Sequence, residues 1–154
     1  MLKTRKVQPG DLHIITTHRR KMFEDMGADP AVLDAMAHAF TVWLKPRLED
    51  GRYFGYIVEE NEAVVAGIGM MLVDWPPHTV HPDSSQRGYI LNLFVEPEHR
   101  GHGIATDLTK LAESDLQVCG VTYAILHAST KGRSIYQKLG WSSTSEMAKI
   151  LANI

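Results

Sequence analysis

Apolar residues recur at roughly helical spacing in two segments near the start of the chain. The turn Pro9-Gly10-Asp11 leads into the first segment, and Asp11 can cap the helix that follows, because its carboxylate accepts hydrogen bonds from first-turn amides. Gly27 is a natural stop for this helix. The inward positions of the predicted helix are Leu12, Ile15, Met22 and Met26.

The second helical segment begins at Asp29-Pro30. Asp29 is placed as the cap, and Pro30 stands at a position where its missing N–H costs nothing. Pro46 leaves the end of the helix open, and the helix is over by Gly51. Its apolar face consists of Leu33, Met36, Phe40, Trp43 and Leu44.

The composition then changes to strand-forming residues. Tyr53–Glu59 and Ala63–Val73 are rich in β-branched, aromatic and small apolar side chains, and they flank Glu60-Asn61-Glu62. This pattern predicts a β-hairpin.

Strand and helix alternate in the following segment. A polar loop over residues 78–86 precedes a strand at Gly88–Val95, which ends at Pro97. A helix is predicted over Ile104–Cys119, and a strand over Val121–His127.

The chain closes with a short helix and a last predicted strand. Ile135 and Leu139 belong to the helix, which stops at Gly140, and Ser143–Leu151 is the strand. The order of elements predicts an α/β fold with a mixed sheet and helices packed against it. We expect one domain over residues 1–154.

The bulk composition narrows the class of protein. With 44% hydrophobic residues and a net charge of −2, the chain lacks the strongly basic surface that a duplex nucleic-acid binder needs. Its single cysteine, Cys119, cannot form an internal disulfide. The longest apolar stretch, Ala63–Val73, is too short to span a bilayer as a helix, and no apolar run follows the basic N-terminus. We therefore expect a cytoplasmic protein without nucleic-acid or membrane partners.

The segment after Val95 carries the candidate chemistry. A predicted strand ends at Pro97, a short loop brings Arg100 and two glycines, and a helix starts at once. The first amides of a helix have no internal partner, and the helix dipole favours anions there. Glycines let an anion approach the backbone, and Arg100 adds a positive charge, so the loop fits a pyrophosphate.

Other phosphate loops fit this segment less well. No Gly-Lys-Ser/Thr follows, as a Walker loop requires, and Thr106 stands where a dinucleotide fingerprint has its third glycine. Taken alone, the glycine pair is equally consistent with a tight strand-to-helix turn.

The wider context is more specific. The run Val95-x-Pro97-x-x-Arg100-Gly101-x-Gly103-Ile104-Ala105 closely resembles the acetyl-CoA-binding motif of the GNAT superfamily of N-acetyltransferases, Arg/Gln-x-x-Gly-x-Gly/Ala. A second segment, residues 128–141, resembles the family segment that ends in Tyr-x-x-Leu-Gly-Phe, with Trp141 in place of phenylalanine. Many members have asparagine where this chain has Ser129 and alanine where it has Gly132.

The resemblance implies a fold, a cofactor and a reaction. The fold would be GNAT-like, with a central, mostly antiparallel, twisted sheet and about four helices. The protein would move an acetyl group from acetyl-CoA to an amine, which we expect to belong to a small molecule, by direct attack in a ternary complex. A homodimer is left open. The implied cofactor-binding residues are Leu93, Phe94, Val95, Arg100, Gly101, His102, Gly103, Ile104, Ala105, Thr106, Ser129, Gly132 and Tyr136.

The resemblance also supplies a proton donor. Ser129, Gly132 and Tyr136 share one helical face by their spacing, and in the family this tyrosine often protonates the departing thiolate. The base that removes the proton of the amine is open. We name Tyr136, Asn92 and Asp74 as catalytic candidates; Glu96, His127 and a water are the alternatives for the base.

Two alternatives concern function. His78-x-x-His81 and His99-x-x-His102 have ligand-like spacing but no cysteine partners and no obvious third ligand, so we expect no metal. A catalytically silent acetyl-CoA sensor or interaction module is the main competitor to an enzyme, and a nucleotide-phosphate binder is a remoter one. The presence of Tyr136 favours the enzyme.

Overall fold

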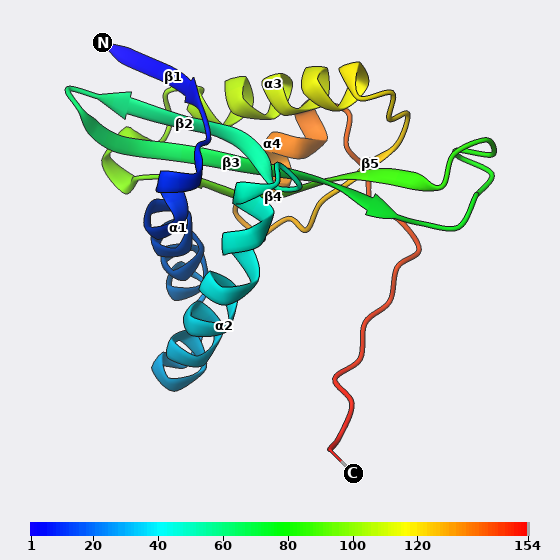
Figure 1. Ribbon diagram of the computed structural model, residues 1–154, viewed down its shortest axis with the longest axis horizontal. Coiled ribbons are helices and arrows are strands. Elements are labelled where there is room, and N and C mark those ends of the chain that lie inside the picture. The colour runs from blue at the N-terminus through cyan, green and yellow to red at the C-terminus, as the bar shows by residue number, and fades with distance from the viewer. Residues whose placement is uncertain (154) are drawn as a thin grey trace.

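A five-stranded sheet with helices on both faces forms the framework of the protein (Figure 1). The structure is a computed structural model that describes residues 1–153. The strands lie in the order β1-β2-β3-β4-β5. Their bounds are Leu2–Lys6 (β1), Phe54–Glu60 (β2), Ala63–Asp74 (β3), Gln86–Val95 (β4) and Ala124–Ile125 (β5). The helices are Leu12–Asp25 (α1), Pro30–Glu49 (α2), Ile104–Val118 (α3) and Arg133–Lys138 (α4), with 3-10 turns at Pro9–Asp11 and Pro97–His99.

The helices divide the core into two parts. In Figure 1, α1 and α2 lie below the sheet and α3 above it. The inward stripe of α3 packs on β3 and β4 and consists of Ile104, Leu108, Ala112 and Leu116. A second core joins α1 and α2 to the sheet through Ile15, Phe40, Leu44 and Leu48. Because both faces of β3 are covered, its middle is a continuous buried apolar run rather than an alternating one.

A β-bulge interrupts β4 beside its centre. Gly67 of β3 pairs with Phe94 and Gly69 pairs with Leu91, so that Asn92 and Leu93 lie opposite the single residue between them. Asn92 has a φ of 56°, in the left-handed region where asparagine is one of the tolerated residues. The bulge therefore redirects the side chains of β4 at this point.

The contact between β4 and β5 is short. The strands run parallel and pair only at Gly88 with Ala124 and at Tyr89 with Ile125. Beyond Tyr89, the backbone of β4 from Ile90 to Val95 has no strand on its β5 side among residues 1–153. The C-terminal half of β4 thus presents an open edge.

Most of the expected elements are confirmed. The mixed α/β sheet, mostly antiparallel with four helices around it, is the predicted architecture. The hairpin of β2 and β3 and the helix that begins at Ile104 lie where the pattern places them. The helix α2 continues through Pro46 to Glu49. No helix within residues 1–153 combines the length and the apolar character that crossing a membrane requires.

Three expectations about strands need correction. The prediction of a last strand over Ser143–Leu151 is wrong: this segment is extended but unpaired, and it leads away from the body of the protein (Figure 1). The strand predicted over Val121–His127 shrinks to Ala124–Ile125. Since β5 is so short, it offers little edge for a further ladder. The strand β1 was not predicted, because Leu2–Lys6 is a polar, exposed edge strand without alternation.

Candidate active site

The loop between β4 and α3 presents a row of free backbone amides. Gly101 and Gly103 have φ values of 81° and 83°, which favour glycine, and an added Cβ would meet nothing within 4 Å at either one. Within residues 1–153, the amides of residues 101–106 donate to no other group; the first bonded amide is that of Asp107, at 3.0 Å from the carbonyl oxygen of Gly103. The N-terminus of α3 is therefore shaped to receive an anion.

The predicted loop residues share this environment. Gly101, His102 and Gly103 are exposed, Ile104 is buried under the helix, and Ala105 and Thr106 are half-buried in the first turn. Ile104 anchors α3 in the core, so that the exposed glycines and the free amides face outward.

Arg100 has a different role from the one that its charge suggests. Its Nε donates to the carbonyl oxygen of Val95 at 2.8 Å, and its Nη2 pairs with Asp25 at 2.9 Å. The side chain thus fastens the loop to the end of β4 and to the end of α1. Its positive charge stays beside the loop but is already compensated by Asp25.

The open edge of β4 contains the three predicted pantetheine contacts. The side chains of Phe94 and Val95 are buried and that of Leu93 is half-buried, as expected for packing residues. Only the backbone of these residues is available to an extended ligand at this edge.

The second predicted segment gathers around Tyr136 on α4. Ser129 Oγ accepts the amide hydrogen of Gly132 at 3.0 Å, and the carbonyl oxygen of Ser129 accepts that of Arg133 at 3.0 Å, so Ser129 holds the turn that leads into α4. A Cβ on Gly132 would stand 3.2 Å from Ser129 Oγ and 3.5 Å from the Tyr136 ring. The three residues lie together, but only Tyr136 is on the helix: Ser129 and Gly132 belong to the turn before it, so the expected shared helical face is not what joins them.

The hydroxyl of Tyr136 is held in its protonated form. Burial raises the pKa of Tyr136 to about 12, because the phenolate is poorly solvated there. The ring packs edge-on against Trp141, with centroids 6.3 Å apart. Its hydroxyl has no hydrogen-bond partner among the described residues, and its proton is free to be donated.

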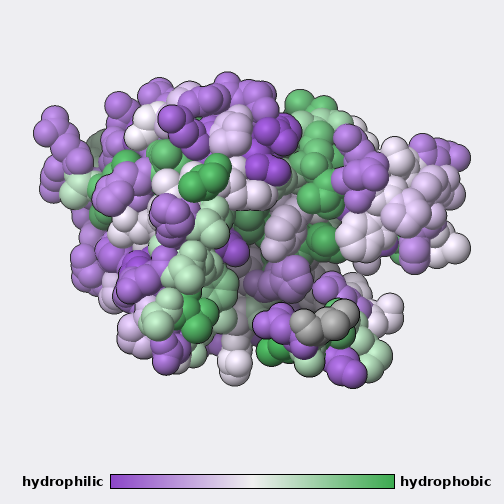
Figure 2. Space-filling model, turned by 60° about the horizontal axis from the view of Figure 1, so that its bottom comes forward, coloured by the Kyte–Doolittle hydropathy of each residue, from purple (hydrophilic) through white to green (hydrophobic). Residues whose placement is uncertain are grey.

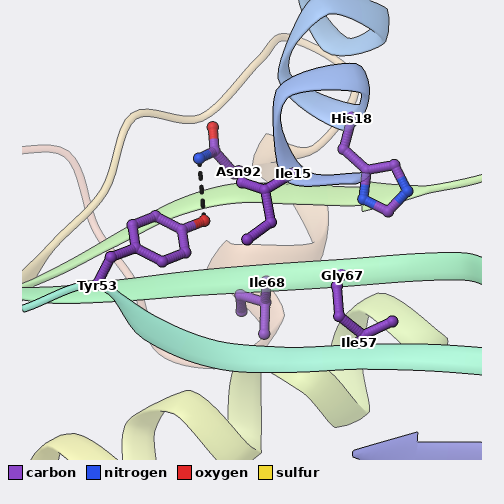
Figure 3. Close-up of a pocket in the computed structure, with 7 residues that line it drawn as sticks. All are labelled: Ile15, His18, Tyr53, Ile57, Gly67, Ile68 and Asn92. Atoms are coloured by element: carbon purple, nitrogen blue, oxygen red, sulfur yellow. Dashed lines mark hydrogen bonds between the residues drawn. The ribbon is translucent and has the colours of Figure 1, made fainter. Parts of the chain in front are cut away.

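Asn92 is buried, and its amide oxygen and amide nitrogen each make a hydrogen bond; Figure 3 shows the one to Tyr53. Its Oδ1 accepts a hydrogen bond from Arg19 Nη1 at 2.8 Å, and its Nδ2 donates to Tyr53 Oη at 3.0 Å. The Tyr53 hydroxyl in turn fills the space above Gly69, where any Cβ would clash. Asn92 therefore connects α1 to the sheet at the bulge, and sequence reasoning did not foresee Arg19 or Tyr53 as its partners.

Asp74 lies away from the other candidates. It is exposed at the end of β3 and pairs across the sheet with Gln86, the first residue of β4. At ~3.3 Å per residue, Asn92 is roughly 20 Å further along β4. The structure does not bring Asp74 together with Asn92.

The alternative bases differ in how free they are. Glu96 Oε1 is 2.7 Å from Lys21 Nζ and is committed to that ion pair. His127 follows β5, with its Nδ1 3.1 Å from Tyr89 Oη and its Nε2 3.7 Å from Glu146 Oε1. His127 thus stands at the gap between β4 and β5, and it is exposed.

The histidine pairs have other partners. Arg87 Nε donates to His81 Nε2 at 2.9 Å, so His81 Nδ1 carries the proton and donates it to the carbonyl oxygen of Ser84. His99 Nε2 lies 2.7 Å from Glu60 Oε2. No group of three or more potential metal ligands occurs within residues 1–153.

The face that carries α1, α2 and the C-terminal segment is hollowed in its middle (Figure 2). On α1, His18 is buried, with its ring centroid 5.0 Å from that of Phe94. Burial lowers the pKa of His18 to about 4, so the imidazole is neutral.

Comparison with known proteins agrees with this geometry. The model of the Acetyltransferase (GNAT) family matches residues 15–141. A crystal structure of a GCN5-related N-acetyltransferase from Ralstonia eutropha is 44% identical and superimposes with a TM-score of 0.97, covering 99% of this chain and 100% of that one. A predicted acetyltransferase from Clostridium acetobutylicum, solved with acetyl-CoA, is 26% identical, with a TM-score of 0.90 over 98% and 96% of the chains.

More distant structures share the fold alone. Glucosamine-6-phosphate N-acetyltransferase from Arabidopsis thaliana is 17% identical and has a TM-score of 0.67, covering 99% of both chains. A sequence comparison with curated proteins finds no significant match.

Proposed function

Since this chain belongs to the GNAT acetyltransferase family, we propose that it transfers an acetyl group from acetyl-CoA to the amine of a small molecule. The observation that carries the proposal is the pairing of free amides at the start of α3 with the open edge of β4 next to it. Membership of the family implies acetyl transfer; the acceptor and the roles of individual residues are our inference.

The residues present fit acetyl-CoA. The amides of residues 101–106 and the dipole of α3 would hold the pyrophosphate, with Gly101 and Gly103 leaving room for it. The backbone of Leu93–Val95 would pair with the pantetheine arm like an added strand. Gly132 would let the arm approach α4, where Ser129 still has a hydroxyl proton to donate.

Bound acetyl-CoA supplies a thioester carbon for the amine nitrogen to attack, so that a C–N bond forms, the C–S bond breaks and a thiolate leaves. Tyr136 holds a proton at Oη that can pass to the leaving sulfur, because its raised pKa keeps the hydroxyl protonated at neutral pH. Its position follows from the turn that Ser129 holds ahead of α4 and from the contact with Trp141.

The nitrogen must also lose a proton, and we propose His127 as the base that takes it. The observation in its favour is its place at the gap between β4 and β5, with Tyr89 on one ring nitrogen. Asn92 has no group that titrates; its proposed part is to shape the β4 bulge. A catalytic role for Asp74 stays a prediction. Its distance from Asn92 along the sheet speaks against that role, and the activity of Asp74→Asn tests it.

We also propose that the protein is a homodimer that uses its C-terminal segment. Residues 142–153 are exposed, and the side chains of Met147 and Ile150 are 93% and 97% accessible. An unpaired extended segment with exposed apolar side chains is suited to pairing with a second copy. The TM-score of 0.97 to the Ralstonia chain leaves little room for this segment to follow another path there.

Light scattering of the full chain tests the dimer. We expect a dimer, and a monomer for a chain that carries Met147→Glu and Ile150→Glu. A monomeric unmodified chain would contradict the proposal. Acetyl-CoA binding by the monomeric variant would show that its fold is intact.

The function is tested by two measurements together. Acetyl-CoA and CoA should raise the melting temperature, by an amount that corresponds to about 2.7 kcal/mol at a hundredfold excess over Kd, whereas ATP and NAD should have little effect. Release of free thiol with a panel of amines should then identify acceptors. Stabilisation without thiol release from any amine would favour the silent sensor, and no stabilisation would refute the cofactor assignment.

A further inference from the structure

Arg19 is a half-buried cation without an acidic partner. Its guanidinium lies between the rings of Phe40 and Phe23, with its Cζ 4.6 Å and 5.2 Å from their centroids. Nη1 donates to Asn92 Oδ1 at 2.8 Å. Within residues 1–153 no carboxylate lies within 4.0 Å of it, although its neighbour on α1, Arg20, pairs with both Glu24 and Asp34.

The hydrogen bonding of Arg19 is incomplete. Nε is buried and has no partner among the described residues, and Nη2 has none either but is not sealed from solvent. A buried polar group without a partner points to a missing water, ion or ligand. Burial accordingly lowers the pKa of Arg19, since the charged form loses hydration that nothing replaces.

The position of Arg19 relates this unpaired charge to the proposed reaction. Asn92, which Arg19 contacts, forms the bulge at the start of the open β4 edge. Tyr89 lies three residues earlier on the same strand, and its hydroxyl is the partner of His127. On the far side of His127, its Nε2 lies 3.7 Å from Glu146 Oε1.

Contacts along β4 therefore set these groups in order. Arg19 supplies a positive charge at Asn92, and His127 with Glu146 supplies a base and a carboxylate at Tyr89, three residues earlier on the strand. A molecule that carries an anionic group and an amine matches this order. A simple alkylamine would leave Arg19 unpaired.

We propose that Arg19 is the anion-binding residue of the acceptor site and that the acceptor is an amine that bears a carboxylate. Guanidinium groups bind carboxylates through charge-assisted hydrogen bonds, and Nη2 is the donor that remains open. The inference rests on the proposed acetyl transfer and specifies its substrate class.

The test compares matched acceptors. Thiol release is measured for a set of α-amino acids, their primary amides and the amines that lack the carboxylate. We expect kcat/KM to be at least about 10-fold higher for the acids, because only the acids can form a charge-assisted hydrogen bond with Arg19. Equal rates for acids and amides in the unmodified protein would overturn the proposal.

Variants of Arg19 distinguish a role in binding the acceptor carboxylate from a role in holding α1 against β4. Arg19→Met should lower the ratio of kcat/KM for the acids to kcat/KM for the amides by about 10- to 100-fold, whereas Arg19→Lys should keep part of the preference. Arg20→Met, one residue along α1, is the matched control and should keep the full preference for acids over amides. A loss that is the same for acids and amides would mean that Arg19 only clamps α1 to β4.

Two further readouts keep the outcome decisive. If Arg19→Met does not fold, Arg19→Lys and the acid-to-amide ratio of the unmodified protein decide the matter. If no amine turns over, the melting temperature with amino acids against amides still reports anion binding, and an equal response to both overturns the proposal. Acetyl-CoA stabilisation and the transfer to neutral amines report on the proposed function separately.

Discussion

Tyr89 Oη and His127 Nδ1 lie 3.1 Å apart, and this contact joins the last paired residue of β4 to the segment just after β5. The two rings meet edge to face, with centroids 5.7 Å apart. The contact orients the imidazole at the point where the strands separate. His127 Nε2 is directed toward Glu146.

His127→Gln should therefore lower kcat by about 10- to 100-fold, because glutamine can keep a hydrogen bond to Tyr89 but cannot take up a proton. The binding of acetyl-CoA, measured by thermal shift, should be unchanged. Tyr89→Phe removes the hydroxyl and retains the base, so it should cost less than His127→Gln. A wild-type kcat for His127→Gln, with chemistry shown to limit turnover, would exclude His127 as the base.

Gly103→Ala should weaken CoA binding strongly. Its φ of 83° costs an alanine about 1–2 kcal/mol, and the new Cβ would occupy the open space in which the pyrophosphate is proposed to lie. Gly120→Ala is the matched control: its φ is 82°, its surroundings are equally open, and it lies at the other end of α3. The two variants should lose similar stability to urea, but only Gly103→Ala should lose CoA affinity in calorimetry. If both variants bound CoA equally well, the pyrophosphate could not lie at Gly103.

Tyr136→Phe keeps the ring and removes only the hydroxyl oxygen. We expect kcat to fall by roughly 10- to 1000-fold with little change in KM for acetyl-CoA. Since the pKa of Tyr136 is raised to about 12, the neutral hydroxyl persists through the usual assay range, and Tyr136 should not produce an alkaline limb in the pH profile below about pH 11. Equal losses in CoA binding and turnover would instead mean that the hydroxyl seats the cofactor.

His18 should make the protein sensitive to acid. Its pKa falls from 6.5 to about 4 on folding, because burial disfavours the imidazolium; Glu96 opposes this shift and Lys21 adds to it. The folded state thus binds fewer protons than the unfolded state between these values. The stabilisation is complete above pH 6.5 and decreases as the pH falls; the total loss amounts to about 3 kcal/mol once the pH is below 4.

Urea unfolding between pH 7 and pH 4 measures this effect. The unmodified protein should lose stability over that interval, and His18→Gln should lose less. His13→Gln, an exposed position on the same helix, should behave like the unmodified protein. Identical pH dependence in His18→Gln and the unmodified protein would contradict the prediction.

The local pattern of the sequence was sufficient for much of the fold and for the anion-binding loop. Hydrophobic periodicity located α1, α2, the β2–β3 hairpin and α3, because each of these buries one stripe or run of side chains. The loop from Pro97 to Ala105 was recognisable since strand end, glycines and helix start are consecutive in the chain. These helices, the hairpin and the loop depend on residues that are close together in the sequence, so the sequence alone is enough to predict them.

The pairing of strand edges was decided only in three dimensions. Leu2–Lys6 is polar, yet it pairs because β2 has a free edge beside it. Ser143–Leu151 was expected to be the last strand, yet it stays unpaired, and β5 beside it in the chain order is only two residues long. A strand needs a partner edge, and its own residues do not reveal whether one is available.

The acceptor side of the site was likewise beyond the sequence. Arg19 and Asn92 are separated by 73 positions, and the contact between them depends on how α1 packs over the β4 bulge. The same packing leaves Arg19 without a carboxylate within 4.0 Å among residues 1–153, while Glu146 lies beside His127. The residue types were visible from the start, but charge compensation is a property of distances in the folded chain, and only the tertiary structure sets those distances.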